Sequence, residues 1–367
     1  MKDLTKGRPS TLILAFALPI FLANLLQLTY SLVDTRIVGS FLGEDTLAAV
    51  GATTTLSNLM IGFLMGLSNG FAIITAQKFG AKNIADMKKS FAMSLVIGTG
   101  ISILFTIAGL LFLKPILHFL NVPKHLVPVA KGYIAIIIAG LLATFLYDAC
   151  AATLRAIGDA VTPLIILAIS VALNIVGDLF FVVVLKTGVK GAAIATVLAQ
   201  IIAFVICWIY MIRKYEILRL QKEDFKDPSP IMVKEMISAG MSMGFMSSLV
   251  NIGTLTLQTA INKLGKDIII AHTAARKITE IFMIMFSVFG QTMATYCGQN
   301  MGAGKIDRVK RGIWLAIVYT AIWSGLTIIA SYTIGGWLVY LVTGSYNKTV
   351  ILNATNYLKF DTLFYFV

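Results

Sequence analysis

PLIILAISVALNIVGDLFFVVVL, residues Pro163–Leu185, has the length and composition of a membrane-spanning helix. A helix of about 20 apolar residues crosses the ~30 Å hydrocarbon core of a bilayer. Asn174 and Asp178 interrupt this segment and are four residues apart, so their side chains share one helix face. A carboxylate inside a bilayer costs about 2.5–3.5 kcal/mol on insertion scales. Asp178 is therefore either part of a cation or proton site, or a residue at the water boundary that a neighbouring helix neutralises.

The composition of the whole chain is typical of an integral membrane protein. Of its 367 residues, 58% are hydrophobic and 13% are charged, and the mean hydropathy is +0.87. The apolar runs are too long for the alternating strands of a membrane barrel. We distinguish ten apolar segments: 11–35, 48–75, 90–113, 127–153, 163–185, 190–212, 231–261, 268–297, 311–333 and 349–367. We therefore predict an all-α polytopic membrane protein in a lipid bilayer, with no nucleic acid as partner despite the net charge of +13.

The positions of the basic residues predict how the chain crosses the membrane. Lys and Arg are concentrated in alternate loops, for example over Lys78–Lys89 and Arg213–Lys234. We assign Arg155, after the fourth segment, to the same set of loops. Because cytoplasmic loops carry the excess of Lys and Arg, the N-terminus is expected in the cytoplasm. The predicted location is the cell membrane.

An internal repeat relates the two parts of the chain. With a shift of 222 residues and no gap, Leu42–Asp45 aligns with Leu264–Asp267, and Gln77–Ala81 aligns with Gln299–Ala303. The common offset at matching loops indicates a duplication. Six helices per copy would insert both copies the same way up, which predicts two parallel-repeat lobes with a substrate path between them.

The repeat also predicts the domain organisation. We expect an N-lobe of six transmembrane helices at 1–212, a cytoplasmic linker at 213–230 and a partial C-lobe at 231–367. The second copy contains about four of its six expected helices before the chain ends. We expect that the chain is either a fragment or a naturally truncated protein.

Several polar residues of the first lobe are predicted to lie at one depth. Asp34, Asn174, Asp178 and Thr196 fall in the outer parts of their helices and offer carboxylate, amide and hydroxyl oxygens. Small hard cations prefer such oxygen ligands, with Asp34 and Asp178 as the metal ligands if Na⁺ is bound. Two carboxyls in an apolar pocket can also carry a proton. The sequence leaves Na⁺ and H⁺ both open.

Three acidic residues have a structural interpretation beside the functional one. Asp34 could form an ion pair with Arg36 at a helix end, and Asp148 could pair with Arg155. Glu280 follows Arg276 by four residues, a spacing that permits an ion pair within one helix.

Enzyme motifs are absent from the sequence. The three histidines form no HExxH motif, and the segment 302–306 lacks the leading glycine and the Ser or Thr of a phosphate-binding loop. We therefore predict that the chain is not an enzyme and needs no cofactor apart from a coupling ion, Na⁺ or H⁺.

Short motifs along the whole chain resemble those of the multidrug and toxic compound extrusion (MATE) transporters. They are Leu32–Gly39, Leu154–Asp159, Leu173–Asp178 and Gly191–Thr196, together with the repeated loops at 77–81 and 299–303. The resemblance implies two six-helix lobes and a cation or proton site at Asp34, Asn174, Asp178 and Thr196. It also implies a substrate cavity with Gln27, Tyr30, Asp148 and Glu280 in its lining.

The function implied by the resemblance is multidrug efflux. Such a protein is a monomeric secondary antiporter that exports organic cations or drugs in exchange for Na⁺ or H⁺ by alternating access. One alternative is a lipid-linked saccharide flippase of the same superfamily, which would need several basic residues in its cavity. Two further alternatives are an inactive fragment and a membrane-embedded enzyme acting on lipid.

Overall fold

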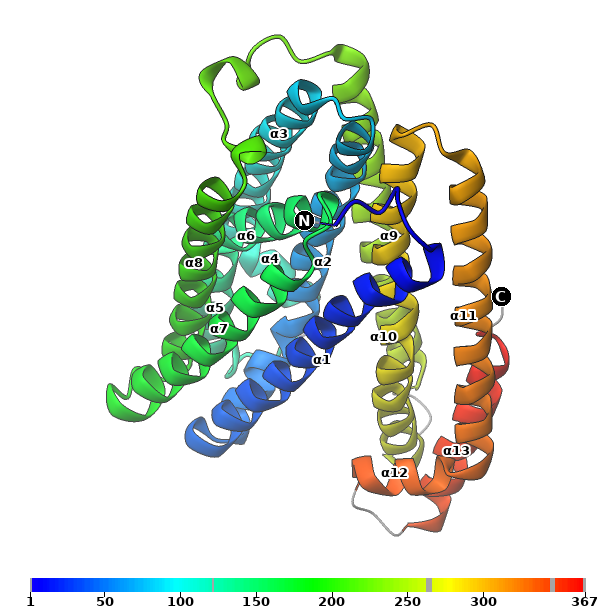
Figure 1. Cartoon of the computed structure of the whole chain (residues 1–367). Helices are drawn as coiled ribbons and strands as arrows, with labels where there is room; N and C mark the ends of the chain where they lie inside the picture. The colour runs from blue at the N-terminus through cyan, green and yellow to red at the C-terminus, as the bar shows by residue number, and fades with distance from the viewer. Residues whose placement is uncertain (1, 121, 262–265, 344–346, 366–367) are drawn as a thin grey trace.

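The structure, a computed structural model, describes residues 2–120, 122–261, 266–343 and 347–365, and within these ranges it is all-helical without strands (Figure 1). The helices of the first half are α1 Pro9–Leu42, α2 Glu44–Gly80, α3 Ile84–Leu111, α4 Leu113–Phe119, α5 Val127–Ala139, α6 Leu141–Ala156, α7 Val161–Asp178 and α8 Val189–Lys214. Those of the second half are α9 Pro230–Ile261, α10 Lys266–Gly302, α11 Ile306–Thr333, α12 Gly335–Thr343 and α13 Lys348–Leu363. Three short elements lie in two of the connections: the π-helical η1 Leu179–Val184 between α7 and α8, and the 3₁₀ turns η2 Glu216–Leu218 and η3 Lys222–Phe225 between α8 and α9. The prediction of an all-α membrane protein is confirmed.

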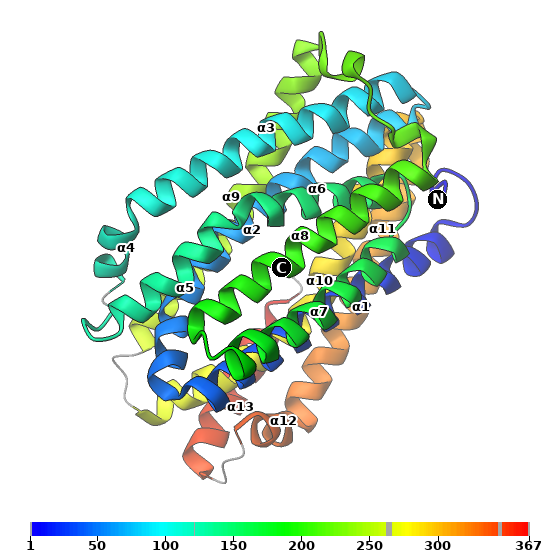
Figure 2. The same ribbon diagram turned by 90° about the vertical axis from the view of Figure 1, so that its left-hand side faces the viewer.

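Within the described residues, 7 helices are long and apolar enough to cross a membrane, and the count rises to 8 if α5 and α6 form one bent span. These two helices are bent by 43° relative to each other around Gly140. Figure 2 shows α5 and α6 in succession along the chain. A side chain at Gly140 would collide with Val197 of α8, so the glycine permits α8 to pack closely at the bend. The two other expected segments correspond to α9 and α13, which are helical but lie outside this set of spans.

The two halves are joined along α2 and α9 by close backbone packing. A Cβ atom on Gly66 would lie 2.5 Å from the carbonyl oxygen of Met243, and one on Gly70 would lie 2.5 Å from that of Ala239. Real Cβ atoms do not approach other atoms so closely, so these two positions of α2 require glycine. Small residues at such spacing are typical of membrane helices in direct contact.

The repeated loops meet each other in a reciprocal contact between α2 and α10. The Cα of Gly80 faces the backbone carbonyl of Gln299, and the Cα of Gly302 faces the backbone carbonyl of Gln77. These are the four residues that the sequence repeat pairs with one another. The exchange of roles is what a two-fold relation between parallel repeats produces.

The N-terminal segment, residues 2–8, crosses from the first half to the second at this end of the molecule (Figure 1). The backbone N–H of Lys2 donates to the carbonyl of Gly158 at 3.2 Å, and that of Leu4 donates to Oε1 of Gln299 at 3.0 Å. Nη1 of Arg308 donates to the carbonyl of Gly7 at 2.9 Å. Leu4 is fully buried. The segment thus links the α6–α7 turn to the α10–α11 hairpin.

The turn before α7 is held by Asp159. Its carboxylate accepts hydrogen bonds from the Thr162 backbone N–H at 3.0 Å, from the Thr162 hydroxyl at 2.6 Å and from the Tyr215 hydroxyl at 2.6 Å. Burial disfavours the charged carboxylate, but these hydrogen bonds outweigh burial and lower the pKa of Asp159 below its usual value. The ionised carboxylate therefore sets where α7 begins.

Candidate functional site: a carboxylate pair in a helix-lined cavity

A cavity of about 480 Å³ lies mainly within the first half of the chain. Its walls come from α1, α2, α5, α6, α7 and α8, and Gln291 of α10 contributes from the second half. The polar side chains in the lining are Asn24, Gln27, Tyr30, Ser31, Asp34, Thr35, Thr54, Ser57, Asn58, Tyr133, Thr144, Tyr147, Asp148, Arg155, Thr196, Gln200 and Gln291. The lining therefore contains three of the four residues predicted for the substrate cavity, Gln27, Tyr30 and Asp148.

Asp178 and Asn174 lie behind the cavity wall and are almost completely buried, with 0% and 3% of their surfaces exposed. With its amide oriented to satisfy both ends, Asn174 donates from Nδ2 to Oδ2 of Asp178 at 2.9 Å. Its Oδ1 accepts from the hydroxyl of Thr196 at 3.2 Å and from the Thr196 backbone N–H at 3.1 Å. The amide of Asn174 thus connects α7 to α8, and its N–H group points toward the carboxyl group of Asp178.

Asp34 completes the cluster from α1. The carboxyl groups of Asp34 and Asp178 lie within hydrogen-bonding reach of each other. Oδ1 of each carboxyl has no hydrogen-bond partner among the described residues. The hydroxyls of Tyr30 and Thr196 are 3.5 Å apart beside them. The structure therefore brings together all four residues that the sequence predicts for the cation or proton site.

The chemistry of this carboxylate pair follows from its surroundings. Two ionised carboxylates in contact repel each other, and the repulsion is strong where water is largely excluded. Either a proton shared between Asp34 and Asp178 or a small cation between them removes that repulsion. Among the described residues no group of three or more His, Cys, Asp or Glu side chains is placed to hold a metal. The donor set of two carboxylates and neutral oxygens suits Na⁺ better than a transition metal.

The backbone changes its winding directly after Asp178. The α-helical hydrogen bonding of α7 gives way to the π-helical η1, whose end is closed by the Leu185 N–H donating to the Phe180 carbonyl at 2.9 Å. π-helical turns are rare and are frequently found at functional sites. Here the change falls at the buried carboxylate.

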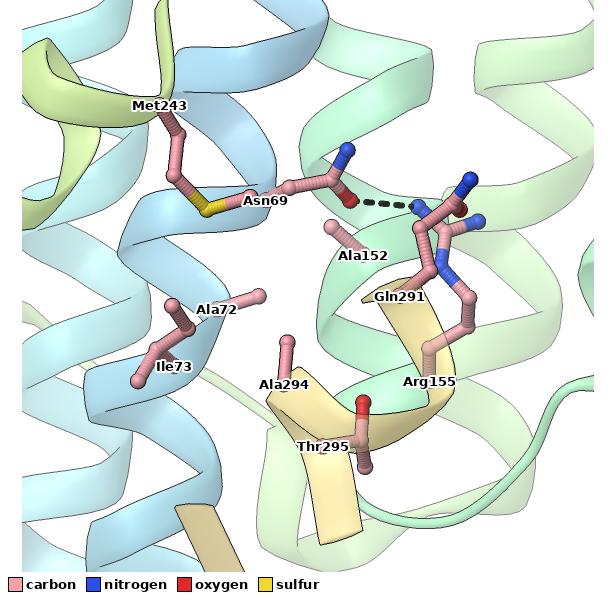
Figure 3. A pocket seen from close by; sticks show the side chains of 9 residues that line it. All are labelled: Asn69, Ala72, Ile73, Ala152, Arg155, Met243, Gln291, Ala294 and Thr295. Atoms are coloured by element: carbon pink, nitrogen blue, oxygen red, sulfur yellow. Dashed lines mark hydrogen bonds between the residues drawn. The ribbon is translucent and has the colours of Figure 1, made fainter. Parts of the chain in front are cut away.

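Asp148 and Arg155 lie deeper in the cavity, on α6. No ion pair of 4.0 Å or less joins them in the described part of the chain. Instead, Nη2 of Arg155 donates to Oδ1 of Asn69 at 3.1 Å (Figure 3). The assignment of Arg155 to a cytoplasmic loop is wrong, because α6 continues to Ala156 and turns this side chain into the cavity.

The MatE family profile matches residues 19–180 and 242–367, which is most of the chain. Over 311 residues the chain is 30% identical to the probable multidrug resistance protein YpnP of Bacillus subtilis (strain 168), a match that covers 84% of this chain and 68% of that protein. The chain belongs to the MatE family. The probable multidrug resistance protein YoeA of the same organism is 28% identical to this MatE protein over 341 residues, covering 89% of this chain and 70% of YoeA.

Solved structures share the MatE fold of this chain. The crystal structure of MATE in the bent conformation superposes with a TM-score of 0.90 at 21% sequence identity, covering 99% of this chain and 80% of the other. A structure described as the outward-facing conformation of a multidrug resistance MATE family transporter of the MOP superfamily gives a TM-score of 0.90 at 21% identity, with 99% and 81% covered. Members of this family are transport proteins rather than enzymes.

Glu280 of this MatE chain lies apart from the cavity. Its side chain is exposed on α10 and forms an ion pair with Lys277 at 3.0 Å. Arg276, the partner considered from the sequence, instead donates to the hydroxyl of Thr254 at 3.1 Å. The ion pair with Arg276 that the spacing permits does not form, and Lys277, three residues before Glu280, takes that place. Glu280 is not part of the described cavity lining.

Two groups of polar residues escaped the sequence analysis of this MatE protein. Tyr133 and Gln200 line the cavity, and Oε1 of Gln200 has no partner among the described residues. In the second half, Asp361 of α13 accepts from Thr279 at 3.0 Å and from Tyr365 at 2.9 Å. The internal repeat was an available signal. With a slip of two residues from the 222-residue offset, Tyr133 aligns with Tyr357, which lies one helical turn before Asp361.

Proposed function

We propose that this MatE protein is a secondary antiporter that exports organic cations or drugs in exchange for Na⁺ or H⁺ by alternating access. The contact between the Asp34 and Asp178 carboxyls beside the cavity carries the proposal. A site that needs one positive charge to be stable can load an ion or a proton when it faces one solution and release it into the other. The names of the relatives YpnP and YoeA as probable multidrug resistance proteins support a drug substrate.

The distribution of basic residues indicates how the protein is oriented in the membrane, and the orientation gives the direction of transport. The end with the N-terminal segment, the α2–α3 turn, the α10–α11 turn and the segment after α8 carries most of the basic residues, as a cytoplasmic face does. The glycine contacts between α2 and α10 close this end. We infer that the cavity opens away from the cytoplasm, so the external ion reaches the carboxylates first. The protein would act in the cell membrane as a monomer.

Coupling requires that the ion and the substrate favour different conformations. Asp34 is on α1, while Asp178 and Thr196 are on α7 and α8, so an ion between them holds three helices together. We propose that ion binding draws α1 toward α7 and α8, narrows the cavity and releases the substrate outward. Separation of the repeated glycine contacts would then open the cytoplasmic side.

A flippase for lipid-linked saccharides is not favoured. Such a substrate carries a pyrophosphate, which needs several basic side chains. The lining of the described cavity contains one arginine, Arg155, and no lysine.

The test is transport by the purified 367-residue chain in proteoliposomes. Ethidium efflux is measured with an imposed Na⁺ gradient, with an imposed pH gradient and with neither. Efflux that depends on one gradient establishes an antiporter and names the ion. Absence of efflux under both gradients, from protein that is correctly inserted, contradicts the proposal.

A further inference from the structure

We propose that Arg155 forms an anion-binding subsite at the inner end of the cavity, so that the preferred substrates carry an acidic group in addition to a basic one. The inference rests on the proposed export function and specifies its substrate class. It starts from the Arg155 guanidinium, which forms no ion pair with any carboxylate of the described residues.

The first step is the environment of the Arg155 guanidinium. It lies in the last turn of α6, and it lines both the main cavity and a small pocket between the halves. Figure 3 shows the guanidinium beside Asn69 and Gln291, which come from α2 and α10. Its hydrogen bond goes to the neutral amide oxygen of Asn69. No carboxylate of the described chain lies within 4.0 Å of it.

The second step is energetic. The Arg155 guanidinium is half-buried, and removing a charge from water costs free energy unless partners compensate for it. Asp148 acts on this charge through space, but it forms no ion pair with it. Guanidinium groups present several N–H donors in a planar fork that fits carboxylate and phosphate groups with two hydrogen bonds. Among the described residues the guanidinium makes one hydrogen bond, to Asn69, and it lines the main cavity, so other donors of the fork are available there. An anionic group of a substrate would supply the missing charge and accept those donors.

The third step is the position of Arg155 relative to Asp148. The two residues are seven positions apart on α6, which is two helical turns, or about 10.5 Å along the axis, on the same face. Both line the main cavity. The inner part of the cavity therefore presents one acidic and one basic side chain, which act on each other through space without forming an ion pair. A substrate with a basic and an acidic group satisfies both.

The probes for this proposal are two dyes that differ in one group. Rhodamine 19 carries a free carboxylate and is zwitterionic, whereas rhodamine 6G is its ethyl ester and is cationic. Binding of each dye to the purified protein is measured by fluorescence anisotropy, with protein-free micelles as the blank. Equilibrium binding does not depend on ion coupling, so this result is separate from the test of transport.

The variants are Arg155→Gln, which removes the charge, and Arg155→Lys, which keeps it. Arg213→Gln is the matched control, because Arg213 is exposed at the end of α8. We expect Arg155→Gln to weaken rhodamine 19 binding at least ten-fold more than rhodamine 6G binding. Arg155→Lys should recover part of that difference, and Arg213→Gln should cause none.

Two outcomes overturn the subsite: a ratio of the two Kd values that Arg155→Gln leaves unchanged, or no measurable binding of rhodamine 19 to the unmodified chain. Equal losses would mean that Arg155 only supports the packing of α6 against α2. A changed Kd ratio in a protein that transports neither dye would retain the subsite and contradict the export function.

Discussion

The Cα atom of Gly80 packs directly against the backbone carbonyl of Gln299. The repeat partners Gly302 and Gln77 make the same contact with the roles exchanged, so α2 and α10 cross at a point where neither can carry a side chain. This crossing closes the end of the molecule at which the N-terminal segment lies.

A side chain at Gly80 should therefore separate α2 from α10. We expect Gly80→Leu to lower the thermal unfolding midpoint of the purified protein by several degrees and to abolish gradient-driven efflux. Gly100→Leu is the control, because a Cβ at Gly100 meets no atom within 4 Å. A leucine at this helical position should be neutral or slightly stabilising. Equal unfolding midpoints and equal efflux for the two variants would show that the crossing of α2 and α10 tolerates a side chain.

Loss of the Asp178 charge should abolish coupling without loss of the fold. In Asp178→Asn the side chain keeps its size, but the pair with Asp34 no longer needs a proton or a cation. We expect gradient-driven ethidium efflux to fall at least ten-fold while the amount of inserted protein stays unchanged. Asp45→Asn, an exposed residue at the start of α2, should transport normally. Wild-type efflux in Asp178→Asn would remove this carboxylate from the mechanism.

The Asn174 amide should tune the affinity of the site. It donates to Asp178 and accepts from Thr196, so Asn174→Leu leaves buried polar atoms without partners at a cost of about 1–3 kcal/mol. We expect the ion concentration that gives half-maximal efflux to change about ten-fold or more. Asn251→Leu on α9 removes an amide whose bond goes to its own helix, at Ser247, and should leave that concentration unchanged.

Asp159 should make stability depend on pH in the acid range. Its folded-state pKa is lowered by the Thr162 and Tyr215 hydrogen bonds, so its contribution is present above the usual Asp pKa of 3.8 and is lost as the pH falls through the lower folded value. We expect Asp159→Asn to lower the thermal midpoint at pH 7 and to differ less from the unmodified chain below about pH 4. A difference that stays constant across this range would assign the effect to packing rather than to charge.

Leu4 should contribute to stability although it lies near the chain end. Its side chain is fully buried, and truncation of a buried Leu to Ala costs about 2–5 kcal/mol. We expect Leu4→Ala to lower the thermal midpoint clearly. Leu14→Ala is a matched control, because Leu14 is 47% exposed on α1. Equal midpoints for the two variants would contradict the packing of the N-terminal segment.

Part of this site could be predicted from the sequence, because a polar residue inside a membrane-spanning segment is energetically costly and therefore marks a candidate site. Asn174 and Asp178 share a helix face by spacing alone, and the cost of a carboxylate inside an apolar segment singles out Asp178 from the sequence. Asp34 and Thr196 follow from their depth in helices of predicted direction. The internal repeat aligns the loop at Gln77 with the loop at Gln299, and these two loops are in contact in the structure.

The remaining features depend on rotations and partners that spacing does not determine. Arg155 was assigned to a loop because the apolar segment ends near 153, but α6 continues past it. Glu280 has basic neighbours at both permitted spacings, and the ion pair forms with Lys277. The bond from Arg155 to Asn69 links α6 to α2, and no periodicity within one helix can predict a contact between two.

The contacts of the N-terminal segment can form only after the residues of the second half that they involve have been synthesised. Leu4 accepts from Arg308, which is 304 residues further along the chain, and donates to Gln299, which is 295 residues away. At ~5–20 residues per second, the ribosome needs on the order of 15–60 s to make the residues that receive this segment. During that interval residues 2–8 have no native partner in the second half, so the junction between the two halves at this end closes only after Arg308 has been made.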